Sequence, residues 1–231
     1  MRTTQYAILL LLFPISLLGS KIFAKAVKLD VAFQLEAFEP GRAVASNYQD
    51  AFRKAHPSAP SGAVRKVDLV FSSVEYAHVH HFELWMNQQG ELFNGDASSS
   101  LSLELPDGNY EVMLHAEGYL PLLTTAMVSA DTASESILSL DFTTNLYDAE
   151  TGVKGKPGNY QAVAGELYTQ PEEQAEINAL DNFTFHKLLR EDGYLYLIDF
   201  DMNGRVDEDE KELFLANAGN LYRVPTNYYH P

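Results

Sequence analysis

The first two thirds of the chain alternate between apolar and polar residues, which is the pattern of β-strands that bury one face. Val27–Ala37 alternates strictly. Shorter runs of the same kind lie at Val67–Phe71, Phe82–Met86, Leu101–Leu105, Tyr110–His115 and Ile137–Phe142. Turn-forming residues such as Pro106–Asn109 separate these runs, and a helical pattern is confined to Gln49–Ala55. The pattern predicts an antiparallel β-sandwich over residues 27–145 with one short helix.

An acidic segment near the carboxyl end, Asp199 to Glu210, matches the calcium-loop pattern D-x-[DN]-x-[DN]-G-x5-E. Calcium takes roughly six to eight oxygen ligands, which one loop supplies from alternate residues, and Gly204 permits the sharp turn that this requires. The expected ligands are the side chains of Asp199, Asp201, Asn203, Asp207 and Glu210 and the backbone carbonyl of Arg205. The segment therefore predicts a Ca2+ site. Magnesium fits less well, because it retains waters rather than entering an all-protein cage.

A second and weaker copy of this loop lies upstream. An overlay aligns Asn178 with Asp207, Asp181 with Glu210, and Phe185 with Phe214. Asn178 and Asp181 thereby take two ligand positions, but residues 169–176 offer neither an Asp-x-Asp start nor a glycine. We expect this first loop to bind calcium weakly or not at all. Its expected role is structural, with Ile177 pairing against Val206.

Each loop continues into a short predicted helix, Asn182–Arg190 and Lys211–Ala218, and Gly193–Ile198 before the second loop reads as extended. Two loop-plus-helix units without entering helices resemble a dockerin module, a divergent relative of the EF-hand, over residues 163–220. The resemblance implies a small, calcium-folded α-helical module that docks onto a cohesin, itself a β-sandwich. Dockerin loops usually end in Asp where this chain has Glu210, so a generic EF-hand pair stays open as an alternative.

Leu105–Leu120 carries a hairpin signature, L-P-D-G-N-Y-E-V-M-L-H-A-E-G-Y-L. It resembles the L-P-x-G-x-Y hairpin of carboxypeptidase-regulatory-like sandwiches in exported bacterial proteins, which often stand directly before dockerin repeats. The resemblance implies that Tyr110, Val112 and Leu114 point into the core and that glycines make the turns. It brings no catalytic residue with it.

The patterns together predict an α+β multidomain fold. An N-terminal antiparallel β-sandwich is followed by a linker at 146–162, by a small α-helical tandem calcium-loop module of the dockerin or EF-hand kind at 163–220, and by a tail at 221–231.

Residues 1–26 have the layout of a cleavable secretory signal, with Arg2 ahead of an apolar run and Ala24-Lys25-Ala26 as the cleavage site. The apolar run is too short to span a bilayer comfortably, although an uncleaved anchor stays open. The formal net charge of −16 argues against nucleic acids and anionic membranes, and the chain has no cysteine. We expect an exported protein, periplasmic or secreted, with no membrane insertion after signal cleavage.

Two further features suggest other ligands. His78 and His80 share one face of a predicted strand, a spacing that can hold zinc or copper, although the polar face of a half-buried strand explains them more simply. Trp85 could form a platform that stacks on sugars together with Tyr76 and the terminal Tyr222, Tyr228 and Tyr229, but a role in the core explains Trp85 equally well.

We therefore expect a non-enzymatic, exported calcium-binding protein whose C-terminal module docks onto a protein partner. The alternative is a carbohydrate-binding β-sandwich protein in which calcium is purely structural. A metal buffer that uses the histidines is a third possibility.

Overall fold

The computed structural model describes residues 24–75, 78–95, 101–129, 137–144, 153–154, 160–167, 174–190, 196–219 and 221–223. Most of the predicted signal segment, linker and C-terminal tail lies outside these ranges. None of the helices in the described ranges has the length and apolar character needed to span a membrane.

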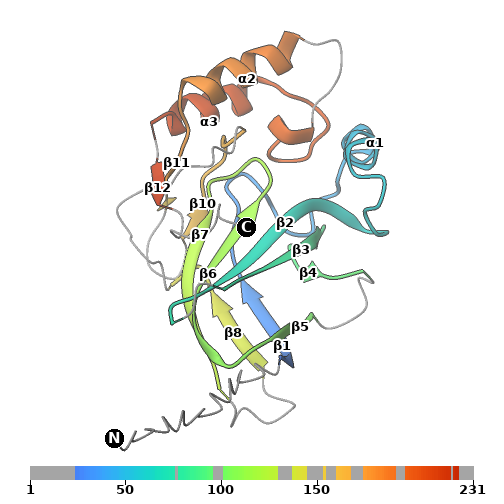
Figure 1. The fold of residues 1–231 in the computed structure, drawn as a ribbon. Coiled ribbons are helices and arrows are strands. Elements are labelled where there is room, and N and C mark those ends of the chain that lie inside the picture. The colour runs from blue at the N-terminus through green and yellow to red at the C-terminus, as the bar shows by residue number, and fades with distance from the viewer. Residues whose placement is uncertain are drawn as a thin grey trace, which may run out of the picture.

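The largest element is a five-stranded antiparallel sheet with the order β4-β3-β2-β6-β7 (Figure 1). Its strands are β2 (Ala63–Ser73), β3 (Val79–Asn87), β4 (Leu92–Phe93), β6 (Gly108–Ala116) and β7 (Leu122–Val128). The central strand β2 pairs with β3 on one side and with β6 on the other. Three of the predicted strands, β2, β3 and β6, are confirmed in this sheet, whereas β4 and β7 were not predicted.

A second sheet has three strands, in the order β5-β1-β8. Strand β1 (Lys25–Ala32) runs antiparallel to β5 (Ser102–Leu105) and parallel to β8 (Ile137–Asp141). Two small antiparallel ladders add β9 (Val153–Lys154) to β10 (Gln161–Ala162) and β11 (Gln174–Glu176) to β12 (Leu221–Arg223).

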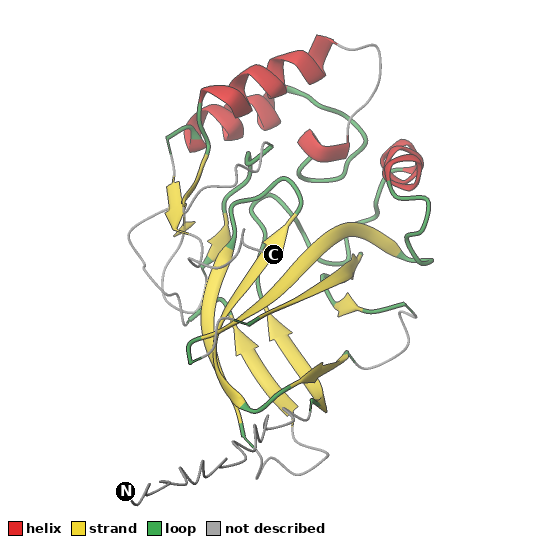
Figure 2. Ribbon diagram, viewed as in Figure 1, coloured by secondary structure: helices red, strands yellow, loops and turns green. Residues whose placement is uncertain are grey.

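Helices are short and lie at one end of the sheets (Figure 2). They are α1 (Ser46–Ala55), α2 (Ala179–Arg190), α3 (Glu208–Asn217) and the 3-10 turn η1 (Tyr196–Ile198). The three α-helices agree with the predicted helical segments. The extended structure predicted before the acidic loop Asp199–Glu210 is wrong at Tyr196–Ile198, where the backbone is helical.

The two sheets share one hydrophobic core. Leu29 of β1, Leu103 of β5 and Leu140 of β8 belong to the same cluster of buried residues as Leu69 and Leu114 of the five-stranded sheet. Tyr110, Val112 and Leu114 also point into this core, as the hairpin resemblance implies. Two sheets around one core are compatible with the predicted β-sandwich.

The predicted fold class is nevertheless wrong, because the chain is mainly β-sheet and its C-terminal part is not a separate α-helical tandem-loop module. The opposite face of the five-stranded sheet, at Val70, Met113 and Leu123, is buried under side chains from the C-terminal part. Those covering side chains are Ile177, Phe185, Ile198 and Phe214. The helices therefore cover a face of the sheet rather than enclosing a core of their own. The segment boundaries given above stay predictions.

A buried arginine ties helix α1 to the sheet. Arg65, near the start of β2, is fully buried. Its guanidinium donates hydrogen bonds to the Glu117 carbonyl in the β6–β7 turn and, at 3.0 Å, to the Tyr48 hydroxyl on α1. The Tyr119 ring centre lies 5.0 Å from the guanidinium carbon. A buried cation needs such acceptors and ring faces to offset its lost hydration, so these contacts fix where α1 sits.

We expect Arg65→Lys to lower the free energy of unfolding by about 2–3 kcal/mol, because an ammonium group is a point donor that cannot span both acceptors as the guanidinium does. Urea unfolding measures the change. The matched control is Arg53→Lys on the exposed side of α1. Equal unfolding free energies for the two variants would show that stability does not require the guanidinium of Arg65 to bind both acceptors.

Candidate metal centre

The acidic segment forms a compact loop between η1 and α3. Two of its residues have positive φ angles, Met202 at 58° and Gly204 at 85°. Met202 and Phe200 are buried, so the loop is anchored in the core between its acidic positions. The turn at Gly204 is therefore the one that the calcium-loop pattern predicts.

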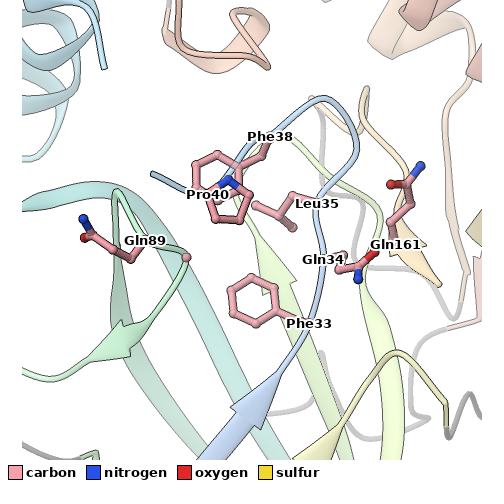
Figure 3. A pocket seen from close by; sticks show the side chains of 8 residues that line it. Phe33, Gln34, Leu35, Phe38, Pro40, Gln89 and Gln161 are labelled. Atoms are coloured by element: carbon pink, nitrogen blue, oxygen red, sulfur yellow. The ribbon is translucent and has the colours of Figure 1, made fainter. Parts of the chain in front are cut away.

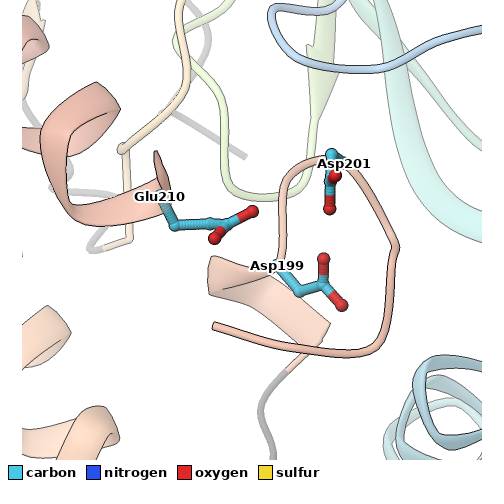
Figure 4. A group of neighbouring side chains, drawn as sticks. All are labelled: Asp199, Asp201 and Glu210. Atoms are coloured by element: carbon cyan, nitrogen blue, oxygen red, sulfur yellow. The ribbon is translucent and has the colours of Figure 1, made fainter. Parts of the chain in front are cut away.

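Three carboxylates converge on one point inside this loop. One oxygen each of Asp199, Asp201 and Glu210 lie within 4.8 Å of one another. Figure 4 shows the three side chains directed toward a common space, with Glu210 reaching in from the first turn of α3. Asp199 is fully buried and Glu210 is only 3% exposed, whereas Asp201 is half-buried. Carboxylates packed this closely repel one another unless a positive charge compensates them.

Backbone amides hold the first two carboxylates in place. The Asp199 carboxylate accepts hydrogen bonds from the Asn203 amide at 3.1 Å and from the Gly204 amide at 2.8 Å. The Asn203 amide also donates to Asp201 at 3.0 Å. Each bond stabilises the ionised form of a carboxylate, so the loop orients its acidic groups before any ligand arrives.

Helix α3 begins with a capping box that positions Glu210. Asp207 accepts a hydrogen bond from the Asp209 amide, and the Asp207 amide donates to Glu210 at 2.9 Å. Burial raises the pKa of the Glu210 carboxyl to about 7. Its ionised form is therefore costly near neutral pH unless a cation lies beside it.

The remaining predicted ligands lie in the loop but outside the converging group. The Asn203 side-chain oxygen accepts from the Arg205 amide at 2.8 Å, and its side-chain nitrogen donates to Asp201. The side chains of Arg205 and Asp207 are exposed. Asp207 serves as the helix cap, a role that the ligand pattern alone does not reveal.

The upstream copy has the same capping geometry without a converging acid cluster. The Asn178 amide donates to Asp181 at 2.8 Å, and the Asn178 side chain accepts from the Leu180 amide. Asp181 is fully buried and also accepts from the Leu167 amide. These bonds repeat those of Asp207 and Glu210. In the described ranges, Asp181 joins no group of three acidic or histidine side chains close enough to share an ion.

The two aligned phenylalanines touch each other. The rings of Phe185 and Phe214 stack with centres 4.4 Å apart and planes inclined by 12°. Ile177 and Val206 lie in the same hydrophobic cluster, but no β-bridge between these two described residues accompanies the contact. The two repeat units identified in the sequence therefore pack against each other through their helices, α2 and α3.

Residues 42–47, which run into the first turn of α1, contact the acidic loop, and the sequence analysis did not predict these contacts. Arg42 pairs with Asp201 at 3.0 Å, and the Ala45 amide donates to the Met202 carbonyl at 3.1 Å. The Asn47 side chain donates to the Gly204 carbonyl. Nothing in the local pattern around Arg42 signals a partner so distant along the chain.

The other candidate ligands take structural positions. His80 packs its ring against Tyr110, and His81 contacts Asp68 at 2.9 Å. Neither His78 nor His80 belongs to a converging metal-type cluster among the described residues. Trp85 is 7% exposed and packs edge-on against Phe52 and His56, so its ring is no open platform for a sugar. Tyr76, Tyr228 and Tyr229 lie outside the described residues.

Comparison of the chain with protein-family models, curated proteins and solved structures finds no match.

Gly204 sits where a side chain has no room, which gives a direct test of the loop's packing. An added Cβ would lie 2.6 Å from the Ala45 Cβ and closer still to the Asn47 side chain. We expect Gly204→Ala to lower the free energy of unfolding by about 2–4 kcal/mol, from strain at positive φ plus the clash.

Gly62→Ala is the matched control, since Gly62 has φ +86° and nothing within 4 Å of the added Cβ. Both variants place an alanine at positive φ and lose stability for that reason. Only in Gly204→Ala does the added Cβ also clash with other atoms. Chemical unfolding in chelator compares the two. Equal losses would mean that the loop does not pack against Ala45 and Asn47 at the start of α1.

Proposed function

We propose that this protein binds one Ca2+ ion in the loop Asp199–Glu210 and that the ion clamps the C-terminal part onto the β-sheets. The observation that carries the proposal is the convergence of Asp199, Asp201 and Glu210. Two oxygens that each lie roughly 2.4 Å from one calcium ion are at most about 4.8 Å apart. The spacing of the three carboxylates meets that limit.

The donor set favours calcium over other ions. It consists of carboxylate oxygens, with further carbonyl and amide oxygens in the same loop, and a hard cation of flexible coordination suits such ligands. Zinc and copper favour nitrogen and sulfur, which the converging group lacks. Burial of Asp199 and Glu210 strengthens the case, because a divalent charge offsets the cost of keeping both ionised away from water.

Bound calcium would act on the fold through the loop's neighbours. The loop contacts the segment before α1 through Arg42–Asp201 and Ala45–Met202, and the Tyr119 hydroxyl lies 3.3 Å from the Phe200 carbonyl. An ion that fixes the loop would therefore stabilise α1, the β6–β7 turn and the C-terminal helices together. A non-enzymatic role outside the cytoplasm, where calcium is abundant, fits a single site of this kind.

Calcium binding is expected to require both buried carboxylates. We expect isothermal titration calorimetry to give one site per chain, and Asp199→Asn or Glu210→Gln to weaken it at least about a hundredfold, because each change removes a charge and an anionic ligand. Glu208→Gln is the matched control, since Glu208 lies in the same helical turn but is exposed. Absence of binding heat in the wild-type protein, with unfolding also unaffected by calcium, would refute the proposal.

Arg42 is expected to weaken calcium binding at this site. Its guanidinium holds an Asp201 oxygen at 3.0 Å and places a positive charge beside the site. Arg42→Gln should therefore tighten calcium binding by about two- to fivefold, the scale of a partly exposed ion pair. Arg53→Gln on the exposed side of α1 controls for net charge. Weaker calcium binding in Arg42→Gln than in this control would place the cation away from Asp201.

A further inference from the structure

A cavity of about 250 Å3 opens between three segments far apart in the sequence. It lies between the chain after β1, the turn that joins β3 to β4, and strand β10. Its lining includes Phe33, Gln34, Leu35, Phe38, Gln89 and Gln161. Figure 3 shows Phe33 and Phe38 in the middle, with Gln89 on one side and Gln34 and Gln161 on the other. The calcium loop contributes no residue to it.

The lining combines apolar surface with neutral polar groups. Phe33 and Phe38 are half-buried, so each keeps part of its ring accessible. None of the lining residues carries a charge. The carboxamides of Gln34, Gln89 and Gln161 make no hydrogen bond to another residue in the described ranges. Each carboxamide therefore has a donor and an acceptor to offer to a ligand.

The wall of the cavity is held in an uncommon backbone conformation. Ala37, between Leu35 and Phe38, has φ 64° without being a glycine. The Glu36 amide donates to the Ala162 carbonyl at 3.0 Å, and the Ala162 amide donates to the Gln34 carbonyl at 2.8 Å. These bonds fix the strained segment against β10. Strain of this kind persists where the surroundings enforce it, and it is concentrated at ligand sites.

We propose that this cavity binds one neutral pyranose unit of a saccharide. A pyranose ring has an apolar C–H face that fits against a phenyl ring, here Phe33 and Phe38, and hydroxyl groups that both donate and accept. The three glutamine carboxamides supply the matching donors and acceptors. The volume lies below the roughly 300 Å3 at which pockets for drug-sized ligands begin, so it accommodates a single ring. The proposal does not depend on the calcium site.

Charge separates this ligand from others of similar size. The chain carries a formal net charge of −16, and no described residue that lines the cavity is cationic, so nucleotides, acidic sugars and phosphorylated sugars are disfavoured. An uncharged nucleoside could also stack on phenylalanine and bind to a carboxamide. The three carboxamides lie on both sides of the Phe33 and Phe38 rings. The hydroxyl groups around a pyranose can reach all three carboxamides, whereas the hydrogen-bonding edge of one flat base reaches those on one side only.

Saturation-transfer difference NMR on the full chain in millimolar calcium tests the proposal. The probes are the methyl pyranosides of glucose, galactose and mannose, N-acetylglucosamine, glucuronate and adenosine. We expect at least one neutral pyranoside to bind, and its dissociation constant to rise about tenfold in Phe38→Ala, the scale of one aromatic contact. Gln89→Ala, at an exposed position, should weaken binding similarly without disturbing the core.

Matched controls use the same substitutions elsewhere on the surface. They are Phe183→Ala on α2, where the side chain is 69% exposed, and Gln49→Ala on α1. Both should bind as the wild-type protein does. The proposal is overturned if no neutral pyranoside gives a saturable signal, if binding survives both pocket substitutions, or if glucuronate or adenosine is preferred.

Discussion

Two acidic side chains removed from water impose the main constraint on this structure. Asp199 and Glu210 are buried at the two ends of one loop, with Asp201 between them. An ionised carboxylate in such a place costs several kcal/mol unless charge and hydrogen bonds compensate it. Backbone amides and the capping box at the start of α3 supply part of that compensation. A divalent cation would supply the rest, and this is why we interpret the loop as a metal site rather than as an acidic turn.

The acidic loop contacts several parts of the molecule, so a change in its conformation would affect all of them. It contacts the segment before α1 on one side, while α3 carries Phe214 onto the outer face of the five-stranded sheet on the other. Tyr119 joins the loop to the buried Arg65, which in turn holds Tyr48 of α1. A change in the loop would therefore reach both sheets through contacts that are already close-packed.

The sequence predicted elements better than their assembly. Strands β1, β2, β3, β5, β6 and β8 were predicted because apolar residues alternate along them. The acidic loop was singled out because its spacing is specific, and calcium binding by it is our proposal. The separate helical module was wrong, because periodicity tells which face is buried but not what covers it. A signal was present: Leu69-Val70-Phe71 and Val112-Met113-Leu114 are apolar on both faces, which indicates a sheet covered on both sides. Contacts such as Arg42 with Asp201 join distant segments and leave no local pattern.

The most direct test of the calcium assignment is a crystal structure of the protein grown in millimolar calcium, with anomalous differences measured at a long wavelength. We predict one anomalous peak that marks a calcium ion, with oxygens of Asp199, Asp201 and Glu210 at about 2.3–2.6 Å from it. We also predict that the Arg42 side chain no longer pairs with Asp201. An Arg42–Asp201 pair that persists, with no peak among the three carboxylates, would contradict the account.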